Sequence, residues 1–526
     1  MTGGDPMIEP MGAATFVAVL GCTSLLAFAA RWFRPGPELP TLEGWALADR
    51  RFGTATVWFL LGGTIYTAYT FAALPGLVYG TGSLGFFALP YTVIVYPLAF
   101  VLLPKLWREA RRGGHITVAD YVRDRHGSPG LALVVAITGV LATMPYIALQ
   151  LLGIRAVLAA GGLYPRGAAG DLALVGVFAF LALATYRHGL RAPAIISLAK
   201  GTAIFASVLA VTAVVLHQLG GPGPMFDGAE RALAAHGAPG ASLTLGPGMF
   251  TVYASLALGS AMALLMYPHV LTAAFAARGP DTLRRASIGL PAWTGVLGLF
   301  ALLGVGALAA GVRAPPGAAE AAVPLLVREL MPAALTGLVF GALAVGALVP
   351  AAIMSIAVAT LFVRNIYAPY FHPTSTPLHQ MRIARLVSLV AKVGAIVFVF
   401  GLRDQDAINL QLLGGVWILQ TFPAVAIGLY SRRLHPRALL TGWAAGMVAG
   451  TVLVVRSGFS SVAPIGVGGW EVSAYTALIA LAANLLVVAA LTPVLDRLGV
   501  PRGAGPRPRT VPPVPPPLGG RTETIA

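Results

Sequence analysis

Long apolar runs separated by short polar segments dominate the chain. Each run has about 20 residues or more, the length that an α-helix needs to cross the hydrocarbon core of a bilayer. The pattern predicts an all-α polytopic membrane protein with about 13 transmembrane helices. The predicted spans are 12–31, 55–80, 84–104, 131–160, 168–186, 193–217, 247–276, 286–311, 332–362, 384–402, 407–430, 438–456 and 472–495.

The second predicted span differs from an ordinary lipid-facing helix. The stretch from Trp58 to Gly80 has a glycine pair near its start, five hydroxyl side chains in its middle, and then Leu74-Pro75-Gly76. Backbone groups freed by a helix break need partners, so a break is tolerated only where protein or a water-filled cavity surrounds it. Unwound carbonyls there can bind a cation, and the N-terminus of a half-helix favours an anion. We interpret the stretch as a mid-membrane binding site; the alternative is a kinked helix with small residues at a helix contact.

Composition agrees with a membrane protein. Of the 526 residues, 57% are hydrophobic and 10% are charged, whereas a soluble domain has roughly 25% charged residues. A net charge of +16 would suggest a nucleic-acid partner in a soluble protein. Here the basic residues fall in the loops between spans, so no nucleic-acid partner is predicted. The single cysteine, Cys22, excludes an internal disulfide and a cysteine metal cluster.

The basic residues also predict the orientation in the membrane. Alternate loops hold 21 arginines and lysines on one side and six on the other. The positive-inside rule assigns the richer set to the cytoplasm, which places the N-terminus outside and the C-terminus inside. The high content of glycine, alanine and arginine suggests a bacterium, and therefore a bacterial inner membrane that surrounds the chain as its lipid partner.

Few ionisable side chains lie inside the predicted spans. All 19 acidic residues fall in loops, tails or helix ends, and only Arg155, Lys200, His269 and Lys392 remain within the spans. Intramembrane ionisable residues are functional candidates by default. Without a buried carboxylate, a cation would be held by carbonyls and hydroxyls, and the positive or titratable groups suit an anionic solute. The alternatives are snorkelling of Lys200 to the cytoplasm and a structural role for His269 at a kink made by Pro268.

Uncharged polar residues mark three further spans. Tyr146 and Gln150 are four apart on one helix face, Gln411 lies in the eleventh span, and Ala352 and Ser355 lie in the ninth. Polar residues at this density favour a lined pathway; the alternative is hydrogen bonding between helices that only holds the bundle together.

Five motifs are spread along the chain: Ala48-Asp49-Arg50-Arg51-Phe52-Gly53, the broken helix ending Leu74-Pro75-Gly76, Thr117-Val118-Ala119-Asp120-Tyr121-Val122, Tyr267-Pro268-His269 and Ala352-Ile353-Met354-Ser355. Taken together, they resemble the sodium:solute symporter family over residues 40 to 490. Within that family, the stretches GGTIYTAYTFAALPG, PYTVIVYPL, TMPYIALQLLG and GLRAP are similar to bacterial monocarboxylate permeases, which import lactate, pyruvate and similar acids.

The resemblance implies a leucine-transporter-type core of two inverted five-helix repeats, with one leading helix and two trailing ones. The expected parts are a leading helix and loop (1–54), a first repeat (55–217), an external loop (218–246), four helices of the second repeat (247–402), the tenth core helix (403–431), two trailing helices (432–498) and a disordered Pro/Arg-rich tail (499–526).

The resemblance also implies a sodium site, the only cofactor-like ligand expected. Its oxygens would come from the carbonyls of Gly63 and Tyr66 and from Ala352 and Ser355, but Ile356 stands where the family has a second hydroxyl. Losing one oxygen weakens a site for a hard cation. Sodium and proton coupling therefore both stay open.

A lysine near this site offers a different source of positive charge. Proline permeases carry an acid in the fifth core helix, and here the region has Ser197 and Lys200. A buried lysine can shuttle a proton, so Lys200, with His269, is a candidate for a proton or charge substitute. Ile65 also replaces an acid of the proline permeases.

The sequence therefore predicts a symporter that imports small monocarboxylates by alternating access, not an enzyme. The alternative within transport is a sodium symporter of another solute, such as proline or pantothenate; a solute sensor, a channel and a membrane enzyme are the other classes considered. The residues expected to contact the anionic solute are Thr64, Thr67, Tyr69, Tyr146, Gln150 and Gln411.

Overall fold

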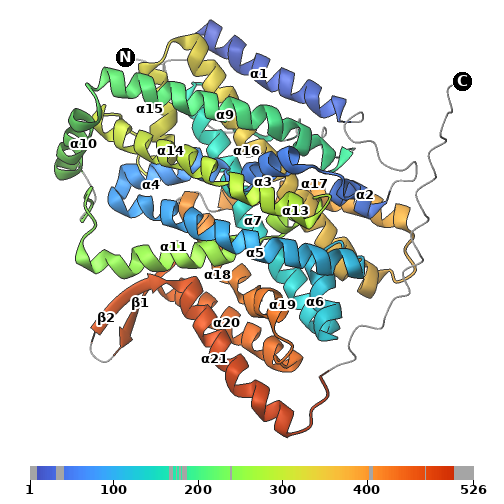
Figure 1. Ribbon diagram of the computed structural model, residues 1–526. Coiled ribbons are helices and arrows are strands. Elements are labelled where there is room, and N and C mark those ends of the chain that lie inside the picture. Colours follow the sequence, from blue (N-terminus) through green and yellow to red (C-terminus); the bar gives the residue numbers. More distant parts are fainter. Residues whose placement is uncertain are drawn as a thin grey trace, which may run out of the picture.

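The protein is a bundle of helices with one β-hairpin (Figure 1). This computed structural model describes residues 9–30, 41–164, 188–236, 240–401, 407–467 and 470–502, with a few positions between 170 and 186. The long unbroken helices are α1 (Pro10–Ala29), α5 (Ala88–Gly113), α7 (Pro129–Ala160), α9 (Arg191–Gln218), α14 (Pro291–Ala309), α16 (Ala333–Phe362), α17 (Pro377–Gly401), α20 (Pro436–Arg456) and α21 (Thr476–Arg497).

Three predicted spans are interrupted. They are α3 (Thr54–Ile65) with η2 (Tyr69–Ala73) and α4 (Leu74–Thr81); α11 (Phe250–Leu264) with α12 (Pro268–Phe275); and α18 (Ala407–Ile418) with η7 (Leu419–Thr421), η8 (Pro423–Ile427) and α19 (Gly428–Tyr430). Short elements connect the spans: α2 (Leu42–Leu47), η1 (Ala48–Arg50), η3 (Ser83–Phe87), α6 (Val118–His126), α10 (Pro222–His236), η4 (Pro247–Met249), α13 (Pro280–Gly289), η5 (Ala319–Ala321), α15 (Ala322–Leu330) and η6 (Val363–Phe371).

The predicted count of thirteen spans is not confirmed. In the described part of the chain, ten helices are long and apolar enough to cross a membrane, or eleven when α3 and the helix after it count as one bent span. The predicted span 168–186 lies mostly outside the described residues. The predicted span 384–402 forms α17, whose first turns hold His379, Arg382 and Arg385 and which is not among the ten or eleven.

A β-hairpin is the one departure from an all-α chain among the described residues. β1 (Val462–Val467) pairs with β2 (Trp470–Tyr475) in antiparallel register, so the last predicted span begins at Thr476 and not at residue 472. The Tyr475 hydroxyl donates to the carbonyl of Leu412, 2.7 Å away. The hairpin thereby fixes the start of α21 against α18.

The centre of the bundle is α16. Every side chain in its most apolar 18-residue window is buried, and the helix packs against α1, α7, α9 and α17. Small residues allow these close approaches: a Cβ on Gly337 would collide with the carbonyl of Gly12, and one on Gly341 with the side chain of Val19. Glycine therefore fixes the α1–α16 contact.

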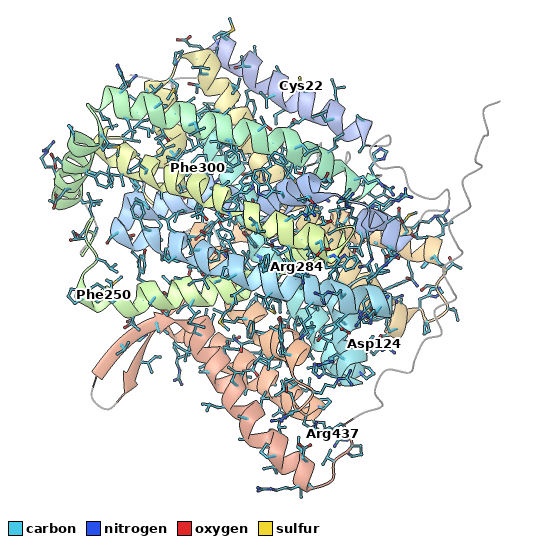
Figure 2. All side chains as sticks on the ribbon, in the orientation of Figure 1. Cys22, Asp124, Phe250, Arg284, Phe300 and Arg437 are labelled. Atoms are coloured by element: carbon cyan, nitrogen blue, oxygen red, sulfur yellow. The ribbon has the colours of Figure 1, made fainter. Side chains whose placement is uncertain are left out.

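Loops that the sequence assigned to one side of the membrane meet at one end of the bundle. At the predicted cytoplasmic end, the Trp107 indole N–H donates to the carbonyl of Ala277 at 2.9 Å. At the other end, the Tyr79 hydroxyl donates to the carbonyl of Val312 at 2.7 Å. Figure 2 shows Asp124 at the end where α6 lies, far from Phe250 at the start of α11.

Candidate functional site

The helix that the sequence expected to break is broken. α3 ends at Ile65, the next helix begins at Tyr69, and the two are bent by 50°. Tyr66 has an extended backbone, φ −95° and ψ 99°. Leu74-Pro75-Gly76 does not make the break, because Pro75 lies in the first turn of α4, where a proline lacks no needed N–H. The unwound residues are Tyr66 and Thr67, and Ala68 already has helical backbone.

Gln150 of α7 binds the unwound backbone. Its Oε1 accepts from the N–H of Ala68 at 3.0 Å. Its Nε2 donates to the Thr67 hydroxyl at 3.3 Å and to the carbonyl of Tyr146 at 3.1 Å. Gln150 has no exposed surface. One amide side chain thus joins α7 to the backbone of the break.

Lys200 of α9 lies on the other side of the break. Its Nζ donates to the carbonyl of Gly63 at 2.9 Å and to that of Tyr66 at 3.1 Å. These are the two carbonyls expected to hold a cation. Lys200 is 1% exposed, so it does not snorkel to the cytoplasm. The ammonium and the expected ion share one position.

The other half of the expected sodium site is on α16, which packs against α3. The Ser355 hydroxyl donates to the carbonyl of Ala352 at 2.9 Å within its own helix. Ile356, one residue on, contributes no oxygen. A hard cation needs several oxygen ligands at once, and here two carbonyls are already bonded to Lys200. The residues present do not fit a sodium ion.

The remaining hydroxyls of the break differ in how they are satisfied. The Thr64 hydroxyl donates to the carbonyl of Leu61 at 2.8 Å, as a threonine inside a helix commonly does. The hydroxyls of Tyr69 and Thr70 are buried and have no hydrogen-bond partner. Buried polar groups are nearly always paired, so these two hydroxyls are available to a solute.

A cluster of aromatic rings lies beyond Gln150. The ring centroids of Tyr146, Tyr267 and His269 are 5.2 to 5.4 Å apart. Both ring nitrogens of His269 are buried without a partner. The Tyr267 hydroxyl donates to the carbonyl of Gln411 at 3.1 Å, and the Oε1 of Gln411 is buried and unpaired. The structure thus brings the predicted His269 and Gln411 to the same ring cluster as Tyr146.

The sequence analysis missed a hydroxyl chain behind the break. The hydroxyl of Tyr66 lies 2.7 Å from that of Tyr96. Tyr96 is hydrogen-bonded to Thr294, whose hydroxyl lies 2.9 Å from that of Thr92. The Tyr66 ring stacks on Trp293, with centroids 5.3 Å apart. Tyrosines and threonines on two other spans were the available signal.

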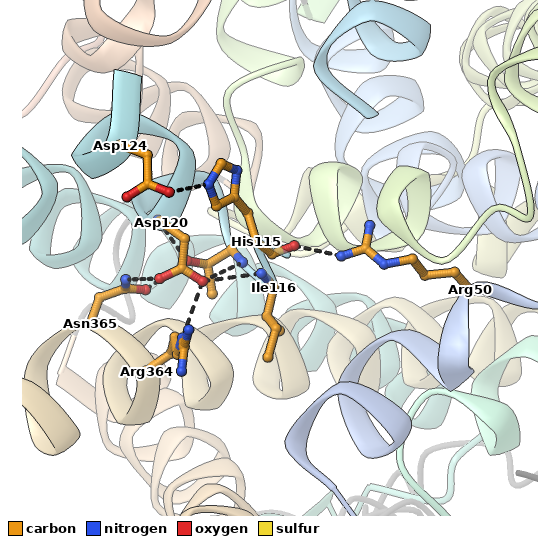
Figure 3. Close-up of polar contacts among 8 residues, drawn as sticks. Arg50, His115, Ile116, Asp120, Asp124, Arg364 and Asn365 are labelled. Atoms are coloured by element: carbon orange, nitrogen blue, oxygen red, sulfur yellow. Dashed lines mark hydrogen bonds and ion pairs between the residues drawn. The ribbon is translucent and has the colours of Figure 1, made fainter. Parts of the chain in front are cut away.

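A second feature that the sequence analysis missed is a polar network at the predicted cytoplasmic end (Figure 3). The Asp120 carboxylate accepts from the Nδ2 of Asn365 at 2.9 Å and from the Nε of Arg364 at 3.2 Å. It also accepts from the backbone N–H of Ile116 at 3.0 Å and caps α6 together with Thr117. The capping motif was visible in the sequence, but its partners on η6 were not.

Two ionisable side chains at the same end, those of Arg50 and His126, connect further loops. The Arg50 guanidinium donates to the carbonyl of His115 at 2.5 Å and to Glu43 at 2.8 Å. Burial lowers the pKa of Arg50, and the neighbouring Glu43 opposes that shift. Burial also lowers the pKa of His126, whose Nε2 donates to the carbonyl of Ala424 at 2.9 Å. α6 is packed against α5, α7 and η8.

Comparisons with known proteins agree on a transporter. The model of the sodium:solute symporter family matches residues 45–450. A monocarboxylate transport permease protein of Rhizobium johnstonii is 45% identical over 489 residues, covering 93% of this chain and 98% of its own. An uncharacterised symporter of Bacillus subtilis, YodF, is 32% identical over 458 residues, covering 86% and 88%.

A solved structure supports the fold. A Na⁺-coupled sialic acid symporter, in a substrate-bound outward-open state, superposes with a TM-score of 0.74 at 14% identity, covering 93% of this chain and 98% of that one. At this identity the likeness concerns the fold alone, and it agrees with the predicted leucine-transporter-type core. Because the family model covers most of the chain, the protein is a member of the sodium:solute symporter family.

Proposed function

We propose that the chain is a secondary active transporter that imports small monocarboxylates by alternating access. One observation carries the proposal: the helix break is buried, and an amide from another span, Gln150, bonds its free N–H. The name of the Rhizobium johnstonii relative, 45% identical, supports the solute class.

The break offers a carboxylate its donors. The N–H of Ala68 stands at the positive end of the half-helix that follows, where an anion is favoured. Gln150 Oε1 accepts from this N–H, and a solute carboxylate takes over that bond. The Thr67 hydroxyl lies beside it, and the unpaired Tyr69 hydroxyl supplies another donor. Thr64 borders the site from the end of α3.

The ring cluster borders the proposed solute position. The rings of Tyr146, Tyr267 and His269 are in contact, with centroids 5.2 to 5.4 Å apart. The unpaired ring nitrogens of His269 and the Oε1 of Gln411 suit a hydroxyl or carbonyl next to the carboxylate, as in lactate or pyruvate.

The membrane and its orientation belong to the same proposal. We place the chain in a bacterial inner membrane with the N-terminus outside and the C-terminus in the cytoplasm. The arginine-rich loops support this orientation, because they gather at the end that holds Arg50, His115 and Asp120. Opening at that end would release the solute inward.

Exchange in proteoliposomes tests the solute class without any driving gradient. Purified protein is reconstituted with unlabelled pyruvate or lactate inside, and labelled pyruvate is supplied outside. We expect rapid exchange that short monocarboxylates inhibit and that proline and pantothenate do not. Exchange inhibited only by proline or pantothenate would favour the alternative solute classes, and the absence of any exchange would contradict the proposal.

A further inference from the structure

Lys200 makes an unusual pair of contacts for a buried lysine. Its Nζ lies 2.9 Å from the carbonyl oxygen of Gly63 and 3.1 Å from that of Tyr66. Gly63 lies in the last turn of α3, and Tyr66 is the residue after it, where the helix stops and the backbone becomes extended. The two carbonyl oxygens are therefore free of the backbone hydrogen bonds that they would accept inside a continuous helix. The ammonium supplies the donors that the broken turn lacks.

No acidic side chain accompanies this ammonium. α1, α3, α14 and α16, the long helices packed against α9, carry no Asp, Glu, Lys, Arg or His within their bounds. α15 also contacts α9 and carries Arg328 and Glu329, and α9 itself carries Arg191 and His217 near its ends. None of the ion pairs in the described part of the chain includes Lys200. A buried charge is costly unless it is paired or hydrogen-bonded, so the carbonyls at the break supply the hydrogen bonds that stabilise the ammonium.

A second buried lysine shows that this arrangement is not general. Lys392 of α17 is 3% exposed, and its Nζ donates to the carbonyl of Ser388 one turn back in the same helix, at 3.2 Å. The Lys392 ammonium thus has its hydrogen-bond acceptor within its own helix. Lys200 instead reaches 137 positions back along the chain to Gly63 and joins α9 to the break.

We propose that the Lys200 ammonium takes the place of the coupling sodium ion, so that the site at the break binds no sodium and solute uptake does not depend on sodium. The inference rests on the proposed function and concerns the ion requirement of that transport. Ile356 and the occupied carbonyls of Gly63 and Tyr66 leave no complete oxygen set for sodium.

The proximity of the two sites gives the ammonium a physical role in solute binding. Tyr66, whose carbonyl binds Lys200, directly precedes Thr67 and Ala68, which are proposed to bind the carboxylate. An anion a few ångströms from an ammonium is stabilised strongly in a medium of low dielectric constant. The Lys200 ammonium therefore favours carboxylate binding at the break, as a bound sodium ion would.

Uptake into proteoliposomes under separate gradients tests the coupling ion. Labelled pyruvate uptake is measured with an inward sodium gradient at equal pH, and with an inward proton gradient when choline replaces sodium. We expect no accumulation under the sodium gradient, and equal pyruvate exchange in sodium and in choline. Sodium should leave the melting temperature of the detergent-solubilised protein unchanged. Accumulation under sodium alone, or a sodium-dependent rise in melting temperature, would overturn the inference.

Variants test the role of the ammonium. Lys200→Met removes it and should lower pyruvate uptake about tenfold or more, the order expected when hydrogen bonds to a buried charged group are removed. Lys200→Arg keeps a positive charge, so it should retain more uptake than Lys200→Met. Lys392→Met is the matched control and should retain uptake.

The outcomes distinguish this inference from the proposed function. Gradient-free pyruvate exchange by the unaltered protein tests the solute class, so its absence would contradict the proposed function. If exchange is present and a sodium gradient drives accumulation, the role of Lys200 is wrong while the solute class stands.

Discussion

Replacing Asp120 tests whether the network at the predicted cytoplasmic end stabilises the protein. The carboxylate accepts hydrogen bonds from Arg364, Asn365 and the backbone N–H groups of Ile116 and Thr117. Asp120→Ala removes all of these acceptors and leaves the Asn365 amide and two backbone donors without them. The α6 helix then loses one half of its capping box and the bonds of Arg364 and Asn365 to the carboxylate, while the Thr117 cap remains.

The structure sets the size of the expected effect. Breaking a buried ion pair by removing one partner costs about 3–5 kcal/mol. The Asp120 side chain is 11% exposed and that of Arg364 is 31% exposed, so solvent screening places the loss near the lower end, about 3 kcal/mol. Asp120→Asn retains one amide oxygen as an acceptor and should fall between the two proteins.

A neighbouring aspartate on the same helix provides the control. Asp124 pairs with His115 at 2.6 Å, but its side chain is 42% exposed, so Asp124→Ala should cost at most about 1 kcal/mol. The assay is the melting temperature of purified protein in detergent, with the four proteins compared at one pH. Equal melting temperatures for Asp120→Ala and Asp124→Ala would refute the reasoning, because burial would then make no difference to the two carboxylates.

Three further changes test packing, polar pairing and titration. Gly62→Ala places a methyl group on the Trp293 indole and should cost about 1–3 kcal/mol of stability. Gly295→Ala has open space around it and should leave the melting temperature unchanged. Equal melting temperatures for the two variants would contradict the close packing of Gly62 on Trp293. Gln150→Leu leaves a backbone N–H of the break without its acceptor and should destabilise by about 1–3 kcal/mol, so an unchanged melting temperature would refute its bridging role. Burial lowers the pKa of His126 in the folded protein. Its contribution to stability is therefore full above its unfolded pKa of about 6.5 and is lost as the pH falls towards the lower folded value. The melting temperature of His126→Gln should depend less on pH below about 6.5, and an equal dependence in both proteins would show that His126 is not the group responsible.

Several details were out of reach of sequence reasoning because they depend on distant packing. Glu320 was assigned to an external loop, but it is 6% exposed and pairs with Arg155 at 3.3 Å. Its burial requires η5 to dock against α4 and α7. The hairpin of β1 and β2 is another case, since an apolar run near the end of the chain reads equally as a strand or as the start of a helix.

The sequence by itself determined that the chain is a helical membrane protein and that the span predicted at 55–80 is broken. These features follow from local physics: long apolar runs suit a bilayer, and hydroxyls and glycines inside such a run need other protein around them. Only the tertiary structure decided what the freed backbone binds. Whether Lys200 reaches water or the carbonyl of Gly63 depends on how α9 packs against α3, and no local pattern records a contact between residues 137 positions apart.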